Sequence, residues 1–324
     1  MSFATLLRQL GRKDFETTEH EAHDLFAALL DGGVPDLEMG AILYALRAKG
    51  ESLTELMGFQ RAIDSRMYHL DPPGGAVLPV VIPAYGSVVS MPNMLPLLAL
   101  MLARFGVPVL LHGTLENHGG VAAAYVLREL DVMPCSTLNQ AQNELASRHI
   151  AFVPTATLCP GLSSLLILRS RLGLHNSAHF MVKLLDPFKG ASLRLISAGE
   201  AGFLEHLNEF IQATPGLGLL FQSTEGEAFA NPLQRPKIEL IRDGETETLF
   251  DSEHSESHTL SSWPSVNNVK TTAAWIKQVL KGEAPLPLPL ANQLACCLYG
   301  AGYAQDFNQA KAIVAVETGC MAVA

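Results

Sequence analysis

Over the first 70 residues, apolar side chains recur at the three- and four-residue spacing of amphipathic helices. Thr18 followed by Glu21, and Ser52 followed by Glu55, have the spacing of capping boxes, which mark helix starts. The pair Gly32-Gly33 predicts a helix end before the next helix. The predicted stripes are Leu6, Leu7 and Leu10; Ala22, Leu25, Phe26 and Leu29; Met39, Ile42, Leu43 and Leu46; and Leu56, Phe59 and Ile63. This region is expected to be a helical bundle.

The pattern changes after a proline- and glycine-rich hinge at 71–75. Short β-branched or apolar runs then alternate with helical segments, which indicates an α/β domain with a mostly parallel sheet. The predicted strands are Val77–Ile82, Pro108–Leu111, Ala151–Val153, Leu193–Ile196, Gly218–Phe221 and Ile238–Ile241, with a helix at Leu95–Phe105 and a final helix at Ala291–Tyr299 after a proline-rich linker. We expect a helical domain over 1–72, joined by helices from about 160–185, and an α/β domain over 73–324.

Composition supports a folded chain in a reducing compartment. Of 324 residues, 48% are hydrophobic and 17% charged, which is too apolar for a disordered chain. The most apolar stretch, Met91–Leu111, is interrupted by prolines, a glycine and an arginine, so no membrane partner is expected. Five cysteines without a CxxC pair predict neither a disulfide framework nor a zinc site. We therefore expect a cytoplasmic protein.

Charge is distributed unevenly along the chain. The net charge of -10 argues against a surface that attracts nucleic acid everywhere. Between Arg148 and Gly199, however, six basic residues accompany one acidic residue, which leaves +5 there and -15 elsewhere. The stretch from Arg242 to His258 carries six acids and one base and predicts a solvated loop or hairpin.

Within the basic window, the segment LRSRLGLHNSAHFMVKLLDPFKG predicts two helices that are broken near Gly173. Asn176 is placed to cap the second helix, on which His179 and Lys183 would share a face. The segment is either an anion-binding face or the ordinary polar surface of two helices. Composition alone does not separate a site for one phosphate from a site for a polymer backbone.

The stretch TEHEAHDLFAALLDGGVPDLEMGAILYALRAKGESLTELMGF resembles the N-terminal helical domain of anthranilate phosphoribosyltransferases, most specifically at ALRAKGES. The following IPAYGSVVSMPNMLPLLALMLARFGVPVLLHGT keeps the spacing of that family without a gap. The resemblance covers nearly the whole chain. It implies a nucleoside phosphorylase/phosphoribosyltransferase-like fold and a homodimer formed through the helical domains.

The phosphate-binding groups of that family are depleted here. The family's GTGGD diphosphate loop reads Pro-Ala-Tyr-Gly-Ser at 83–87, so Gly86 and Ser87 remain in a loop whose first glycine is a proline without an N–H donor. The family's Asn-x-Ser-Thr keeps only Asn93, because its hydroxyl positions are now Leu95 and Pro96.

Two further motifs of the family are incomplete. Its Lys-His-Gly-Asn keeps His112 and Gly113 and lacks the lysine. Its magnesium-binding Asp-Glu pair aligns with Glu227-Ala228, with Glu225 nearby, as a degenerate remnant. An uncompensated buried phosphate costs several kcal/mol. We therefore expect a retained scaffold with a disabled phosphoribosyl-transfer site, no catalytic residue, no metal and no cofactor.

The runs NSAHFMVKL, STEGEAFANP and QLACCLYG resemble the YbiB proteins, a bacterial branch of the same family. That resemblance implies a non-catalytic homodimer that binds DNA and RNA with little sequence preference, through basic residues of the inter-domain cleft. Arg169 matches the substrate-side arginine of the parent family. The expected nucleic-acid-binding residues are Arg169, Arg171, His175, Asn176, His179, Lys183, Lys189 and Arg194.

Two alternatives remain open at this point. One is a phosphoribosyltransferase or related glycosyltransferase that uses phosphoribosyl diphosphate and magnesium. The other is a sensor that binds one small anion and has no polymer partner.

Overall fold

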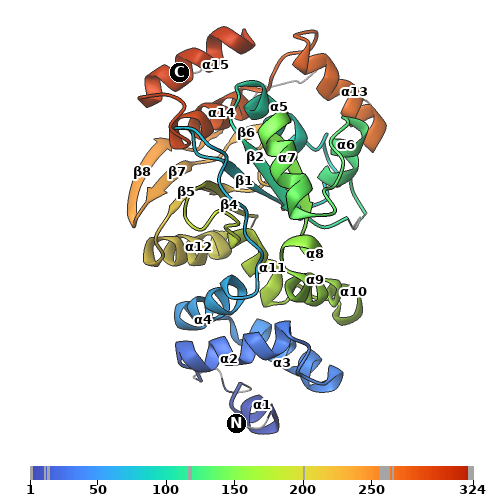
Figure 1. Ribbon diagram of the computed structural model, residues 1–324, viewed down its shortest axis with the longest axis vertical. Helices are drawn as coiled ribbons and strands as arrows, with labels where there is room; N and C mark the ends of the chain where they lie inside the picture. The colour runs from blue at the N-terminus through green and yellow to red at the C-terminus, as the bar shows by residue number, and fades with distance from the viewer. Residues whose placement is uncertain are drawn as a thin grey trace. The chain divides into compact units, whose positions relative to one another are not determined.

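The computed structural model describes residues 3–10, 12, 15–115, 119–199, 201–254, 263, 264 and 266–319. The chain divides into two compact units, Met1–His69 with Thr155–Pro187, and Leu70–Pro154 with Phe188–Ala324. Figure 1 shows the helices of the first unit and the sheet of the second. The predicted fold class, a small helical domain and a larger α/β domain, is confirmed.

The first unit is helical, and local sequence signals set its boundaries. Thr18 and Ser52 accept hydrogen bonds from the backbone N–H of Glu21 and Glu55, so both predicted capping boxes are confirmed. Its elements are α1 (Phe3–Leu10), α2 (Glu19–Leu30), α3 (Asp36–Lys49), α4 (Leu53–Asp64), α8 (Thr155–Leu158), α9 (Pro160–Ile167), α10 (Arg169–Leu172), α11 (Ser177–Met181) and the 3-10 turn η1 (Val182–Leu184).

A buried ion pair ties α3 to the start of α4. Lys49 Nζ lies 2.6 Å from Glu55 Oε2, and the two side chains are 5% and 0% exposed. The other carboxylate oxygen of Glu55 accepts from Thr17 N and Thr17 Oγ1 at 3.3 and 3.1 Å. Both charges are thus compensated inside the unit, and Lys49 belongs to the ALRAKGES motif on which the family resemblance depends, whereas Glu55 lies three residues beyond it.

The second unit contains a seven-stranded sheet in the order β3-β2-β1-β4-β5-β7-β8. The first five of these strands are parallel, and β7 and β8 are antiparallel additions. All six predicted strand regions are strands, and the acidic stretch forms the turn and outer strand of a hairpin as far as it is described. The strands are β1 (Val80–Ala84), β2 (Val109–Gly113), β3 (Ile150–Pro154), β4 (Leu193–Ala198), β5 (Leu217–Gln222), β7 (Ile238–Arg242) and β8 (Glu245–Phe250), with a separate ladder of β6 (Gln234–Arg235) and β9 (Glu253–His254).

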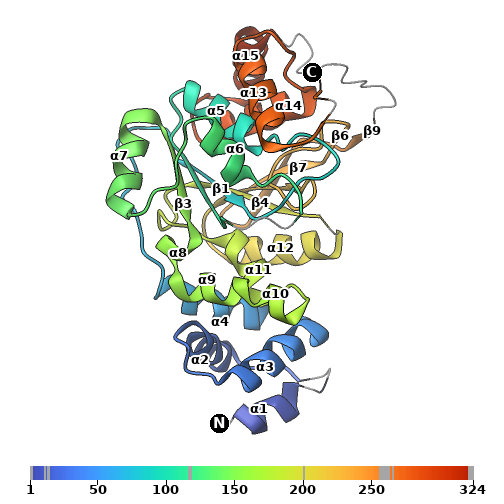
Figure 2. The same cartoon turned by 90° about the vertical axis from the view of Figure 1, so that its right-hand side faces the viewer.

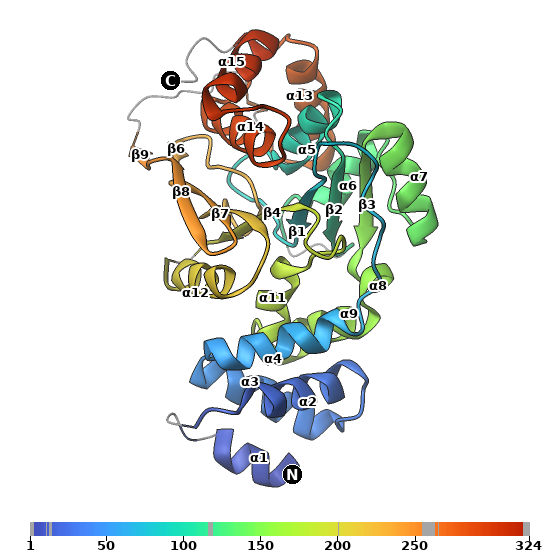
Figure 3. The same ribbon diagram turned by 60° about the vertical axis from the view of Figure 1, so that its left-hand side comes forward.

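Helices cover both faces of this sheet. Figures 2 and 3 show α12 (Ala201–Ala213) on one face and α5 (Leu95–Arg104) with α14 (Leu288–Gly300) on the other. Side chains alternate along each strand, so Leu193 and Leu195 enter the core beneath α14, whereas Arg194 points to the opposite face. The remaining helices of the unit are α6 (Ala123–Glu129), α7 (Leu138–Arg148), α13 (Val269–Leu280) and α15 (Phe307–Thr318).

Three expectations for helices need correction. The helix predicted over Ala291–Tyr299 begins earlier, at Leu288, and is not the last one, because α15 follows it. The regions of α12 and α13 were not identified as helices. The second helix of the basic segment changes to 3-10 geometry at Val182, so His179 and Lys183 do not share one α-helical face.

The apolar stretch Met91–Leu111 contains helix α5 and the start of strand β2. Among the residues whose placement the structure gives, no helix is both long and apolar enough to span a bilayer. Cys135, Cys159, Cys296 and Cys297 are free and buried, whereas Cys320 lies outside the described residues. Burial raises the pKa of the Cys135 thiol to about 11, which makes it a poor nucleophile and metal ligand.

The Lys49→Met variant should be strongly destabilised, because it leaves the fully buried Glu55 carboxylate without its cation. We expect the free energy of unfolding, measured by urea titration, to fall by about 3–5 kcal/mol. The matched control is Arg61→Met, which removes the exposed ion pair with Glu19 and should cost less than about 1 kcal/mol. Equal losses in the two variants would contradict this assignment.

Candidate functional site

The loop after β1, which holds the remnant phosphate motif, is packed against its neighbours through glycines. A Cβ on Gly113 would lie 2.1 Å from Ala84 O, and one on Gly120 would lie 2.7 Å from Ser87 O. A Cβ on Gly86 would lie 2.8 Å from Glu227 N and from Glu227 Cγ. These glycines are therefore required by contacts within the chain, and the space next to Gly86 is filled by a glutamate.

The glutamate-bearing turn at 223–229 explains how this space is filled. Thr224 and Glu227 exchange backbone hydrogen bonds at 3.1 and 3.0 Å, and the two residues between them, Glu225 and Gly226, have φ of 49° and 86°. Positive φ at both central positions is typical of a type I′ turn. The turn carries two carboxylates to the loop after β1, although about 135 residues separate the two segments in sequence.

Glu225 accepts hydrogen bonds from the loop after β1. Its carboxylate accepts from Val89 N at 2.6 Å and from Ser90 N at 3.1 Å, and the Ser90 hydroxyl also donates to it. Two adjacent N–H groups and a hydroxyl are the donors of a typical anion site. Here the anion is a side chain of the same protein.

Glu227 is fully buried beside the second remnant motif. Asn93 Nδ2 donates to Glu227 Oε1 at 3.1 Å and to Val121 O at 2.9 Å, while Asn93 Oδ1 accepts from Leu95 N. The retained Asn93 therefore holds the carboxylate of Glu227 in place and also bonds to Leu95, the first residue of α5.

Asn267 is a residue of this site that the sequence analysis missed. Its Nδ2 lies 3.3, 3.1 and 2.7 Å from the carbonyl oxygens of Val88, Val89 and Met91. Asn267 thus binds three carbonyl groups of the loop after β1, and Glu225 binds two of its N–H groups. Only an adjacent capping asparagine, Asn268 at the start of α13, marks this position in the sequence.

His112 lies near the end of β2 in a fully buried position. The Tyr85 hydroxyl lies 2.8 Å from its Nδ1, and its Nε2 has no hydrogen-bond partner among the described residues. Burial lowers the pKa of His112 to about 3, so the ring is neutral near pH 7. A neutral, enclosed ring fixes the tyrosine and contributes no positive charge for a phosphate.

The residues of this region do not fit phosphoribosyl diphosphate or its magnesium ion. A diphosphate needs space and free backbone donors beside a glycine, but Glu227 lies against Gly86, and Glu225 holds the N–H groups of Val89 and Ser90 farther along the same loop. A magnesium ion needs oxygen ligands that are free to coordinate it. Here both Glu225 oxygens accept hydrogen bonds from the loop, and Asn93 binds one oxygen of Glu227.

The basic segment, defined here as residues 169–183, lies entirely in the first unit. Arg169 and Arg171 are on α10, which ends at Gly173 with φ of 69°. His175 precedes α11 and stacks on His179, with ring centroids 4.7 Å apart and planes at 17°. The predicted break at Gly173 is confirmed.

The structure corrects the role of two residues that were expected to bind nucleic acid. Asn176 is buried and caps α11: its Oδ1 accepts from Ala178 N, and its Nδ2 donates to Leu165 O. Arg194 is 6% exposed on the central strand β4, where a polymer cannot reach it. Lys189 is exposed, but it and Arg194 belong to the second unit. The basic window was continuous in sequence and is divided between the units.

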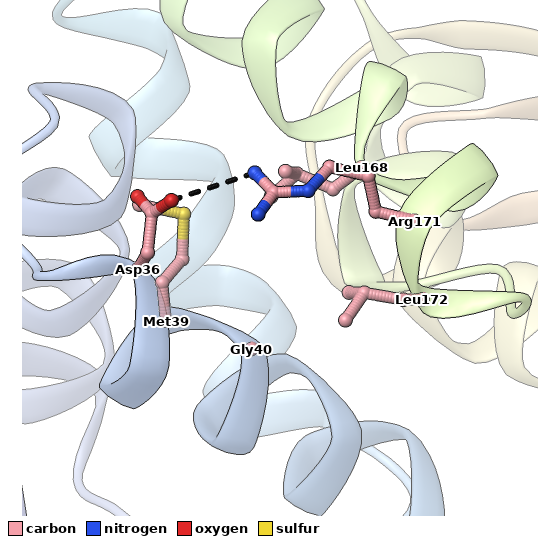
Figure 4. Close-up of a pocket in the computed structure, with 6 residues that line it drawn as sticks. All are labelled: Asp36, Met39, Gly40, Leu168, Arg171 and Leu172. Atoms are coloured by element: carbon pink, nitrogen blue, oxygen red, sulfur yellow. Dashed lines mark hydrogen bonds and ion pairs between the residues drawn. The ribbon is translucent and has the colours of Figure 1, made fainter.

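Arg171 lines a small surface pocket of about 140 Å³ between α3 and α10 (Figure 4). Its guanidinium lies 3.4 Å from an Asp36 carboxylate oxygen, and both side chains are exposed. Met39, Gly40, Leu168 and Leu172 form the apolar remainder of the lining. An exposed pair at this distance is weak.

The buried neutral His112 should make the protein sensitive to acid. The unfolded chain binds a proton at this residue below about pH 6.5, but the native state does so only below about pH 3, so stability rises with pH between these values. We expect His112→Gln to reduce the slope of unfolding free energy against pH by up to about 1.4 kcal/mol per unit between about pH 4 and 6. Urea titrations at several pH values measure it; equal slopes would contradict the assignment.

Gly86→Ala tests the contact between the loop and the turn. The added methyl group meets backbone atoms of Gly226 and Glu227, so we expect a loss of unfolding free energy of about 1–3 kcal/mol. Gly202→Ala is the matched control: this glycine lies in α12 with open space around its Cβ position, and alanine there should be neutral or stabilising. A neutral Gly86→Ala variant would show that the two segments are not in tight contact.

Comparisons with known proteins show which family and fold the chain shares. Residues 4–67 match the helical bundle domain of the glycosyl transferase family. The chain is 27% identical over 318 residues to an anthranilate phosphoribosyltransferase of Methanosphaerula palustris, covering 94% of this chain and 91% of the relative.

Two solved structures share the fold. One is the anthranilate phosphoribosyltransferase of Thermus thermophilus, with a TM-score of 0.77 at 19% identity, covering 96% of this chain and 94% of that one. The other is the Saccharomyces cerevisiae enzyme in complex with PRPP and Mg, with a TM-score of 0.75 at 14% identity, covering 98% and 93%.

The similarity to a second relative is greater and extends over both chains. The protein YbiB of Escherichia coli (strain K12), described as uncharacterized, is 35% identical over 318 residues, which cover 97% of this chain and 99% of that one. The chain therefore belongs to the YbiB-like proteins, which carry the glycosyl transferase helical bundle domain and are related to anthranilate phosphoribosyltransferase.

Proposed function

We propose that this protein is a non-catalytic nucleic-acid-binding protein that contacts the sugar-phosphate backbone of DNA and RNA without sequence preference. The observation that carries the proposal is the basic segment 169–183, which is short and continuous in an otherwise acidic chain. The filled loop after β1 supports the non-catalytic part, because the donors of an ancestral phosphate site are bound by Glu225.

The described contacts define which residues of the segment would bind phosphates. Arg171 is exposed and forms a weak pair with Asp36, and Arg169 and Lys183 are half-buried. Guanidinium groups bind phosphate oxygens in a bidentate manner, which favours arginine at such positions. His175 and His179 add a stacked pair of rings, of which His175 is exposed. We assign Arg169, Arg171 and Lys183 to backbone contacts and the two histidines to supporting ones.

The acidic remainder of the chain favours a narrow binding track. The chain outside the basic window carries -15, so it repels a polyanion wherever it approaches other surfaces. A homodimer would supply two basic segments and lengthen the track. We include self-association on the basis of the family resemblance, and a cytoplasmic location on the basis of the composition.

The alternative function is phosphoribosyl transfer with phosphoribosyl diphosphate and magnesium. The shared fold with enzymes of that activity supports it, but fold alone does not fix function. It would require Glu225 and Glu227 to leave the positions in which they bind the loop and Asn93.

Replacing Arg169, Arg171 and Lys183 together by glutamine should weaken binding to DNA and RNA of every sequence. Loss of up to three phosphate contacts should also reduce the slope of log binding constant against log salt by up to about 2–3. Gel-shift or fluorescence-anisotropy titrations at several salt concentrations measure both quantities. The matched control replaces the exposed Lys270, Lys277 and Lys281 of the α13 region, which removes the same charge at a distance in the sequence.

Two results would overturn the proposal. One is the absence of binding to either polymer at low ionic strength, and the other is an equal loss of affinity in the control.

Calorimetry with phosphoribosyl diphosphate and magnesium decides the alternative. Saturable binding followed by release of diphosphate with an amine acceptor would establish an enzyme.

A further inference from the structure

Helix α2 presents two histidines and an aspartate together on its surface. His23 and Asp24 follow His20 by three and four residues, which places both of them next to His20 on the helix surface. Among the residues that the structure describes, they are the one group of three histidine, cysteine, aspartate or glutamate side chains whose ligand atoms lie within 4.8 Å of one another. No part of the proposed function uses them.

The spacing of these atoms is close to that of a metal coordination sphere. His23 Nδ1 lies 2.9 Å from Asp24 Oδ1, and His20 Nε2 lies 3.5 Å from Asp24 Oδ2. Ligands that bind one ion at about 2.0–2.2 Å are separated by roughly 3–3.5 Å at angles of about 90–110°. The two imidazole rings are nearly parallel, with planes at 4°. Small rotations of the exposed His20 and Asp24 side chains and of the half-buried His23 complete the arrangement.

The backbone that carries these side chains is held rigidly. The capping box of Thr18 and Glu21 fixes the first turn of α2, so His20 does not lie on a frayed end. Gly58 of α4 packs against the same turn, where an added Cβ would lie 2.4 Å from Glu19 O and 2.8 Å from His23 N. A rigid support lowers the entropy that ligands lose when they bind an ion.

We propose that His20, His23 and Asp24 form a binding site for a divalent transition-metal ion of the zinc, nickel or copper class. Two imidazole nitrogens and one carboxylate suit these borderline ions, whereas magnesium and calcium require more oxygen ligands. His20 and Asp24 are exposed, so water fills the remaining coordination positions. Binding exchanges the His23–Asp24 hydrogen bond for bonds to the ion.

The site is separate from the other groups that could bind such an ion. Cys135, Cys159, Cys296 and Cys297 are buried, and burial raises the pKa of each thiol. Glu225 is bound to the loop after β1 in the second unit. A metal ion on α2 thus needs no change in either region.

The test is isothermal titration of the full chain, free of any affinity tag, with Zn²⁺. We expect saturable binding of one ion at this site. The double variant His20→Ala/His23→Ala should lose at least about tenfold in affinity. Asp24→Asn, which keeps the size of the side chain, should weaken binding with an unchanged fold by circular dichroism. His206→Ala, at an exposed histidine on α12, is the control and should bind as the native chain does.

A second readout identifies the ligands directly. The electron paramagnetic resonance spectrum of bound Cu²⁺ should show coupling to nitrogen in the native chain and lose it in the double variant. Unchanged Zn²⁺ affinity in the double variant would overturn the proposal, since the ion would then bind elsewhere, for example at His175 and His179. Absence of saturable binding by the native chain would overturn it as well.

Discussion

The hydrogen bonds of the Glu225 carboxylate to Val89 N and Ser90 N join the turn at 223–229 to the loop after β1, and the arrangement of the remnant motif depends on them. Backbone donors at the end of a parallel strand are a common place for a phosphate, because they are close together and poorly satisfied. In this protein the donors at Val89 and Ser90 lie farther along the loop after β1, and a negatively charged side chain satisfies them. The scaffold of a phosphate-binding fold is thereby kept, while an external anion would have to displace a group that is covalently part of the chain.

The surrounding residues reinforce this state. Asn267 binds three carbonyl groups of the same loop, and Asn93 binds the buried Glu227. Gly86 corresponds to a glycine in the phosphate loop of the family that the sequence resembles. In this structure a glycine is needed at that position because the absence of a side chain leaves room for Glu227. A glycine kept from a binding motif can thus serve packing alone, and its presence does not show that the ligand still binds.

The basic segment has a different physical basis from the filled loop. Its charges lie on two short helices whose ends are set by local signals, the left-handed Gly173 and the capping Asn176. Under the proposed function such a surface would depend little on precise geometry, because attraction between cations and a phosphate backbone acts over several ångströms and tolerates small movements. The basic window is divided between the two units, and residues 169–183 are the part of it that lies within the first unit.

The sequence by itself determined the features that depend on neighbouring residues. Capping boxes at Thr18 and Ser52, the break at Gly173 and the strand runs are set by hydrogen bonds and side-chain alternation within a few residues, so they could be predicted correctly. Only the tertiary structure decided that Glu225 binds the loop after β1, that Asn267 supports it and that Arg194 is buried. These contacts join segments up to about 180 residues apart, and they exist because sheet order and helix packing bring those segments together.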